Sequence, residues 1–236
     1  MQALTLLEQA FDAAAEAGRR VEVWWRDDDA VAIGPRLERT VGLAERCGAS
    51  VALAVIPAMV DVRLLAWCDG RTHVLQHGAA HDNHQTSGKS AELGDARGVG
   101  EIIDELVLLR GRLAVPGFVP VMVPPWNRMR PDLAAALEDA GYRGVSQFGA
   151  GAADTPIRRV DTHIDPVAWR GDRGLASDEA LTRMVRRGLA AGGPIGLLTH
   201  HAVETDTVSE FVRRFAVLVA RHPGATWTDA ARLFPQ

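Results

Sequence analysis

Only two cysteines occur in the 236 residues, Cys47 and Cys68, and neither lies in a Cys-x-x-Cys spacing. Two cysteines are too few for the disulfide framework that stabilises many small secreted proteins. No apolar run approaches the roughly 18 residues that a membrane-spanning helix needs. Residues 1–18 contain no lysine or arginine, so they lack the basic start of a secretory signal. These absences predict a cytoplasmic protein without a membrane partner.

A surplus of basic charge is also missing. The chain has 26 Lys and Arg against 30 Asp and Glu, a formal net charge of −4. Without a basic stripe to neutralise phosphates, nucleic acid is not an expected partner. Apolar residues, in contrast, make up 47% of the chain. This fraction excludes a disordered protein and is enough for one sizeable core.

Short apolar runs alternate with amphipathic segments along the chain. The apolar runs are Val21–Trp25, Val51–Ile56, Thr72–Gln76, Phe118–Val123, Gly144–Gln147, Arg159–His163 and Ile195–Thr199. The helical patterns are residues 1–18, Arg36–Cys47, Val99–Leu113, Pro131–Ala140, Asp178–Ala191 and Thr207–Arg221. This alternation is typical of βαβ units around a parallel sheet. It predicts a single α/β domain over residues 1–236, a distorted parallel (β/α) barrel with about seven strands, with an open doubly wound sheet as the alternative.

Polar clusters follow directly after several of the apolar runs. These clusters are Arg26–Asp29, His77–His84, Pro124–Arg128, Asp165 with Trp169, and His200–His201. In parallel α/β folds the carboxyl ends of the strands converge on one face, where active sites form. The five clusters are therefore expected to meet in one place.

Three consecutive carboxylates, Asp27, Asp28 and Asp29, form the first cluster. Neighbouring carboxylates repel one another and lose hydration when they are partly buried. A divalent cation would offset their charge. A solvated acidic turn that caps the next helix is an equally good interpretation of these residues taken alone.

Four of the eight histidines lie between residues 73 and 84. His77 and His81 have the spacing that places two imidazoles on one side of a helical turn, as a shared metal ion needs. His84 follows three residues later and would join or support them. Two imidazoles and one carboxylate leave coordination positions open, as in a catalytic metal site. Exposed loop histidines are the alternative interpretation.

These residues resemble the polysaccharide deacetylases, carbohydrate esterase family 4. The first motif of that family ends in Asp-Asp followed by a small residue, as in Asp28-Asp29-Ala30. The resemblance implies that Asp28 is the general base and Asp29 a metal ligand. An alignment shifted by one residue gives these roles to Asp27 and Asp28 instead.

The second motif of the family, His-(Ser/Thr)-x-x-His, implies that His77 and His81 are metal ligands, with Gly78 in place of the hydroxyl residue. The third motif is Arg-x-Pro-Tyr in typical members. Pro125 and Trp126 fit it, whereas Val123 stands where an arginine orients the catalytic aspartate. Arg26 or Arg128 would have to supply the missing cation.

The fourth motif, Asp-x-x-Asp-Trp, aligns with Asp165 and Trp169, with one carboxylate absent. The fifth, Leu-x-His, implies that His200 is the general acid, and His201 then occupies the place that aspartate usually holds. Trp126 and Trp169 would form an apolar wall for a small acyl group, although ordinary packing explains them as well. The family fold, a distorted barrel, agrees with the pattern of apolar runs.

The resemblance implies a metal-dependent hydrolase that removes an acyl group, such as acetyl, from an N-acylated sugar or a related small amide. Asp29, His77 and His81 would hold one divalent metal ion, with zinc expected first and cobalt, iron or nickel as alternatives. A metal-activated water would attack, Asp28 would take its proton, and His200 would protonate the leaving amine. The expected partner is a small molecule or an oligosaccharide.

Two other functions fit the same residues. The missing arginine and the missing motif-four carboxylate are compatible with a non-catalytic relative that binds carbohydrate or another ligand. A metal-free barrel isomerase or lyase is the third hypothesis. Bound metal and acetate release would separate the three.

Overall fold

A computed structural model of the protein describes residues 1–149 and 155–235. The strands are β1 (Val21–Ala30), β2 (Val51–Val55), β3 (His73–His77), β4 (Phe118–Val123), β5 (Gly144–Val145), β6 (Ile195–Thr199) and β7 (Ala225–Trp227). The α-helices are α1 (Gln2–Glu16), α2 (Pro35–Arg46), α3 (Val62–Cys68), α4 (Val99–Arg110), α5 (Leu133–Asp139), α6 (Asp178–Ala191), α7 (Asp206–Arg221) and α8 (Ala230–Leu233). Short 3₁₀ turns are η1 (Gly111–Leu113), η2 (Pro125–Asn127) and η3 (His201–Val203).

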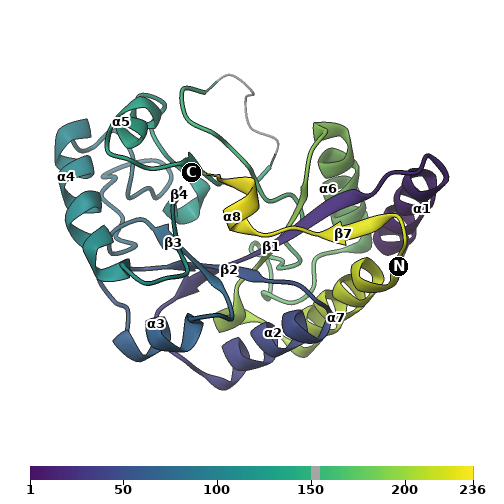
Figure 1. Ribbon diagram of the computed structural model, residues 1–236. Helices are drawn as coiled ribbons and strands as arrows, with labels where there is room; N and C mark the ends of the chain where they lie inside the picture. The colour runs from purple at the N-terminus through teal and green to yellow at the C-terminus, as the bar shows by residue number, and fades with distance from the viewer. Residues whose placement is uncertain (150–154, 236) are drawn as a thin grey trace.

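The strands form one parallel sheet in the order β5-β4-β3-β2-β1-β6, with β7 paired to β1. The sheet curls into a half-barrel, and the long helices lie around its outside (Figure 1). Because every pairing is parallel, all the strands present their carboxyl ends at one edge. The predicted fold class is confirmed.

Strand β1 is longer than the predicted Val21–Trp25 and carries the acidic triplet within it. Its register with β2 shifts between Asp27 and Ala30, which marks a β-bulge. Asp29 has a positive φ of 69°. A bulge bends the strand and redirects side chains, so adjacent carboxylates here reach different partners.

The predicted strand Arg159–His163 is wrong as a continuous strand, and β7 supplies the seventh strand instead. The segment nevertheless lies between the two edges of the sheet. Isolated bridges join Val145 to Arg159 and Ile164 to Leu197. The amides of His163 and Ile164 both donate to the carbonyl of Gly196, at 2.7 and 3.0 Å. Two successive donors on one acceptor break the alternation that a regular ladder requires.

Two apolar clusters lie on the two faces of the sheet. Trp25 packs with the inner faces of the surrounding helices, including Phe211 and Phe215 of α7. Trp24, one residue earlier, points to the opposite face and packs with Phe234, which follows α8. Successive strand residues face opposite sides, so this pair of tryptophans anchors β1 in both clusters.

The predicted helices are present within a few residues of their expected bounds, and 178–191 matches α6 at both ends. The Ser177 side chain accepts a hydrogen bond from the Ala180 amide at the start of α6. Helices α3 and α8, which no prediction covered, begin at the capping residues Asp61 and Asp229. Among the described residues, no helix combines the length and apolar character of a membrane span.

Candidate metal centre

Three side chains from separate parts of the sheet meet at its carboxyl edge. Asp29 lies on the bulge of β1, His77 ends β3, and His81 follows in the next turn. The Oδ1 atom of Asp29 is 3.1 Å from Nε2 of His77 and 3.4 Å from Nε2 of His81. One ligand atom from each residue lies within 4.8 Å of the others. The structure therefore brings together the three residues for which metal binding was predicted.

The orientation of His77 leaves Nε2 free to act as a ligand. Its Nδ1 atom donates to the carbonyl oxygen of Val123 at 2.9 Å, from the end of neighbouring β4. A backbone partner on one ring nitrogen fixes the tautomer and aims the other nitrogen, as in known metal sites. Val123 thus helps to orient His77 through its main-chain carbonyl and not through its side chain.

Charge at the cluster is also suited to a cation. Burial would raise the pKa of Asp29, but the hydrogen bond and charge of His77 lower it well below its usual range. Burial would lower the pKa of His77, yet Asp29 and Asp28 together raise it. Burial and the charge of His77 lower the pKa of His81. One carboxylate and two imidazoles form a donor set that fits a divalent ion such as zinc or cobalt.

Backbone strain concentrates around this cluster. Asp29, His81, Trp126 and Asn127 have positive φ values of 69°, 62°, 54° and 55°. In the described residues only one other non-glycine residue, Arg173, shares this conformation. Such conformations cost about 1–3 kcal/mol each and persist where the surroundings hold them, commonly at functional sites. The Trp126 ring lies 4.3 Å from the ring of His81.

Asp28, next to the cluster, is held by Arg26 from the same strand. Arg26 donates from Nε and Nη2 to the two oxygens of Asp28, at 2.8 and 3.0 Å. Both side chains are buried. Arg26 also donates to Ser146 Oγ at 2.7 Å and to Asn127 Oδ1 at 3.1 Å. Arg26 therefore supplies the cation beside Asp28 that the third motif, with Val123, does not provide.

Asp27 faces a different partner. Its carboxylate accepts hydrogen bonds from the Thr199 hydroxyl at 2.6 Å and the His201 amide at 3.1 Å, and it also contacts His201 Nδ1. Burial would lower the pKa of His201, but the charge of Asp27 and their hydrogen bond raise it. Asp27 thus ties β1 to the end of β6, and Asp29 rather than Asp27 or Asp28 belongs to the cluster.

His200 lies on the other side of the site against Trp169. The two rings meet edge to face at 4.7 Å, and Trp169 Nε1 donates to Asp165 Oδ2 at 2.7 Å. The Nδ1 atom of His200 is buried without a hydrogen-bond partner among the described residues. Burial raises the pKa of Asp165, although the charge of His200 opposes this. Trp169 is 44% exposed, so it forms part of the rim.

Two predicted supporting residues point elsewhere. His84 Nε2 lies 3.2 Å from Nη1 of Arg97. Arg128 donates to the carbonyl of Ser90 at 2.6 Å. The structure therefore does not bring His84 into the cluster or Arg128 to Asp28. Pro125 lies beside the cluster, where its ring faces Gly78.

Glu92 was not predicted, although it contacts the turn that carries His81. Its carboxylate accepts hydrogen bonds from four successive main-chain amides, those of residues 79–82. No local pattern marks this residue, because it lies within a loop of alternating small and polar residues. Two features mark Glu92 as a functional residue, its burial and its contact with the glycine at position 78. Both can be recognised only when the fold is known.

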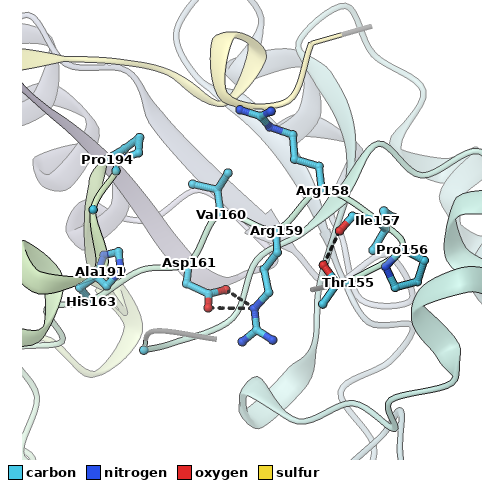
Figure 2. A pocket seen from close by; sticks show the side chains of 13 residues that line it. Thr155, Pro156, Ile157, Arg158, Arg159, Val160, Asp161, His163, Ala191 and Pro194 are labelled. Carbon is cyan, nitrogen blue, oxygen red and sulfur yellow. Dashed lines mark hydrogen bonds and ion pairs between the residues drawn. The ribbon is translucent and has the colours of Figure 1, made fainter. Parts of the chain in front are cut away.

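Figure 2 shows a pocket of about 650 Å³ at the other end of β6. Pro194, which precedes this strand, lines it, whereas the metal centre follows the strand's carboxyl end. Arg159 donates to both oxygens of Asp161 at 3.0 and 2.9 Å. His163 also lines the pocket, and its Nδ1 accepts from the Gly196 amide. The pocket and His163 are therefore separate from the metal centre.

Comparison with known proteins identifies the fold. No family model and no curated protein matches the sequence. A family 4 carbohydrate esterase from Streptomyces lividans, solved with acetate, has a TM-score of 0.58 at 16% identity over 88% of this chain and 91% of that chain. A family 4 acetyl xylan esterase from Clostridium thermocellum, solved with a cobalt ion, has a TM-score of 0.57 at 11% identity over 90% of each chain.

A third solved structure is a mutant of a family 4 pseudoenzyme with restored enzymatic activity. It has a TM-score of 0.60 at 15% identity and covers 92% of this chain and 68% of that chain. Many further structural neighbours are polysaccharide deacetylases, all at low identity. The chain therefore has the fold of the polysaccharide deacetylases of carbohydrate esterase family 4, which confirms at the level of the fold the resemblance that its motifs predicted.

Proposed function

We propose that this protein is a metal-dependent hydrolase that removes an acyl group, such as acetyl, from an N-acylated sugar or a related small amide. The observation that carries the proposal is the convergence of Asp29, His77 and His81 beside the buried Asp28. The structural neighbours support it, since the Streptomyces enzyme was solved with acetate and the Clostridium enzyme with cobalt.

Asp29, His77 and His81 would hold the metal ion. When bound, a divalent ion lowers the pKa of water and polarises an acyl oxygen. Three protein ligands leave coordination positions open for water and substrate. The Val123 carbonyl, through His77 Nδ1, keeps the ligand nitrogen aimed at this position.

Asp28 is the proposed general base. Its two-point contact with Arg26 fixes the plane of the carboxylate. A carboxylate oxygen has two lone pairs, so each can accept a proton from water while it keeps its bond to Arg26. In this chain Arg26 would do what the motif-three arginine does in the family.

His200 is the proposed general acid. Its imidazole faces the same site as Asp29, whose pKa it helps to lower, and Trp169 fixes one edge of the ring. His201 instead contacts Asp27 through its Nδ1 atom. Trp126 and Trp169 would border a small acyl group between His81 and His200.

Metal content and turnover test the proposal together. The purified protein is expected to contain about one zinc or cobalt ion by elemental analysis and to release acetate from N-acetylated monosaccharides. Asp28→Asn is expected to keep the metal and lose turnover, because an amide cannot accept the proton. Asp139→Asn, at an exposed position at the end of α5, is the matched control. A fully active Asp28→Asn protein would refute the assigned base.

A non-catalytic relative is the second candidate. The supporting observation is that a family 4 pseudoenzyme also has this fold, while this chain departs from the family motifs at Gly78 and Val123. Bound metal with ligand binding but no turnover on a broad panel of amides would favour this candidate over the hydrolase. Absence of metal from protein that was purified and then supplied with zinc or cobalt would argue against the hydrolase.

A further inference from the structure

Glu92 is a buried carboxylate that accepts hydrogen bonds from main-chain amides. It is 1% exposed. Its Oε2 accepts from the Ala79 amide at 3.1 Å, and its Oε1 accepts from the amides of Ala80, His81 and Asp82 at 2.7, 3.0 and 3.5 Å. Within the described parts of the chain, no basic side chain forms an ion pair with it. Successive amides that converge on one anion form a nest, which here encloses a side chain of the protein itself.

The carboxylate fills the space that a side chain at position 78 would occupy. A Cβ atom built on Gly78 would lie 1.8 Å from Glu92 Oε2, and 2.6 and 2.8 Å from two atoms of Pro125. Gly78 also has a positive φ of 58°. Position 78 is the one where the family motif carries a hydroxyl residue. Gly78 and Glu92 are therefore complementary, since neither a serine nor a threonine fits while Glu92 is in place.

The segment that carries Glu92 is anchored on both sides. Arg128 donates to the Ser90 carbonyl at 2.6 Å, and the Arg130 amide donates to the Leu93 carbonyl at 2.8 Å. Both partners belong to the stretch that follows β4 and Trp126. These contacts fix the position of the Glu92 carboxylate. The turn that contains His81, with its positive φ, is in turn bound to this carboxylate through its amides.

We propose that Glu92 is the positioning residue of the metal-binding turn and replaces the missing hydroxyl residue at position 78. By fixing four consecutive amides, it sets the direction in which His81 leaves the turn, toward Asp29 and His77. Its negative charge next to the turn also favours a cation in the site. The inference rests on the proposed function, because it assumes that Asp29, His77 and His81 bind a metal.

Glu92→Gln is the test variant, since it keeps the size of the side chain but removes its charge and turns one acceptor into a donor that faces an amide. Supporting groups around metal ligands typically change metal affinity by about 10–100-fold. We expect the affinity of the metal-free protein for Co²⁺ or Zn²⁺ to fall by about tenfold or more, measured by competition with a chromogenic chelator. Glu138→Gln, an exposed glutamate on α5, should bind the metal as the wild type does.

A pair of further variants keeps the inference testable if Glu92→Gln is unstable. Gly78→Ser alone should lower the melting temperature of the metal-free protein, because its Cβ meets the Glu92 carboxylate. Gly78→Ser combined with Glu92→Ala should lower it less than the sum of the two single changes. The Pro125 contacts remain, so the relief is expected to be partial.

The possible outcomes separate the two proposals. Wild-type affinity in Glu92→Gln, with a metal-binding wild type, would overturn the role of Glu92 and leave the proposed function intact. The role of Glu92 would also be overturned if the double variant Gly78→Ser/Glu92→Ala lost as much melting temperature as the two single variants lose together. A wild-type protein that binds neither ion would overturn the proposed function and this inference with it.

Discussion

At the scale of single residues, the buried pair of Arg26 and Asp28 decides how the acidic triplet is arranged. Asp27 and Asp29 have histidine partners, so Arg26 is the cation that is left to balance Asp28. Its guanidinium also bonds Ser146, which links β1 to the chain after β5. The pair therefore has both a structural and a proposed catalytic role, and the two roles can be separated by mutation.

Arg26→Met should destabilise the protein strongly. Removing one partner of a buried ion pair leaves an uncompensated charge and typically costs about 3–5 kcal/mol. The double variant Arg26→Met/Asp28→Asn should be more stable than Arg26→Met alone, because the orphaned charge is then gone. Urea unfolding of the metal-free proteins measures both. If Arg26→Met cost less than about 1 kcal/mol, a value typical of an exposed pair, the buried ion pair would be refuted.

Tyr142 provides a second prediction at this scale, away from the metal centre. The phenol is buried, donates to Gln76 Oε1 at 2.8 Å, and is the only tyrosine of the chain. Burial raises its pKa above the ordinary value of 10.0. Above pH 10 the Tyr142 phenol releases its proton in the unfolded chain but retains it in the folded protein. The free energy of unfolding must therefore fall as pH rises.

The native protein should therefore show no near-ultraviolet phenolate absorbance until it unfolds in alkali. Tyr142→Phe removes this part of the alkaline instability but leaves Gln76 Oε1 without its donor, at a cost of about 1–3 kcal/mol near neutral pH. The thiols of half-buried Cys47 and buried Cys68, whose pKa values burial also raises, remain in both proteins. Phenolate absorbance that follows an ordinary titration in the folded state would contradict the prediction.

The sequence predicted the three residues that converge, Asp29, His77 and His81, better than the residues that support them. His77 and His81 are marked by their spacing, and Asp29 by its place in a motif. Glu92 has no such mark, and Arg26 was one of two candidates for the missing cation, together with Arg128. The roles of both Arg26 and Glu92 depend on which way a side chain leaves a bulge or a loop. The direction of Arg26 toward Asp28, and of Glu92 under Gly78, follows from tertiary packing.

At the scale of elements, strands that are marked by a local sequence pattern were predicted correctly, whereas strands that depend on tertiary packing were not. Strands with continuous apolar runs, such as Phe118–Val123 and Ile195–Thr199, match β4 and β6 at both ends. The strand around Arg159–His163 was predicted from a similar run, yet the shared acceptor at Gly196 prevents a ladder. Strand β7 is only three residues long, too short for an alternation pattern to reveal.

Helix α8 and Phe234 close the barrel interior at the amino ends of the strands. Phe234 is fully buried with Trp24 in one apolar cluster, and a Cβ on Gly144, which begins β5, would lie 2.3 Å from its ring. The aromatic ring thus requires glycine at that position. This element fills the end of the half-barrel that lies opposite the candidate metal centre.

Phe234→Ala should lower the free energy of unfolding by about 3–5 kcal/mol, the usual cost of removing a buried aromatic side chain. Because the cavity forms at the far end of the strands, the metal affinity of the protein that remains folded should match the wild type. Thermal unfolding and chelator competition measure the two quantities. A loss of metal affinity as large as the one expected for Glu92→Gln would show that the two ends of the barrel are coupled.

At the scale of the whole molecule, the proposed metal would connect parts of the chain that are far apart in sequence. Asp29 belongs to β1, His77 to β3, and His81 to a turn that Glu92 holds. A ligand that binds only the folded state stabilises it, by about 2.7 kcal/mol at a concentration one hundred times its dissociation constant. Metal removal should therefore lower the melting temperature, and added Zn²⁺ or Co²⁺ should restore it.

His81→Ala and His84→Ala form a matched pair for this prediction. Both histidines lie in the same loop, but His81 Nε2 faces Asp29 whereas His84 Nε2 faces Arg97. Removing His81 takes away one of three ligands, so the metal-induced rise in melting temperature should largely disappear. Removing His84 should leave that rise unchanged, even if the loss of its contact with Arg97 lowers both melting temperatures. Equal losses in the two variants would mean that the ion does not bind where Asp29, His77 and His81 converge.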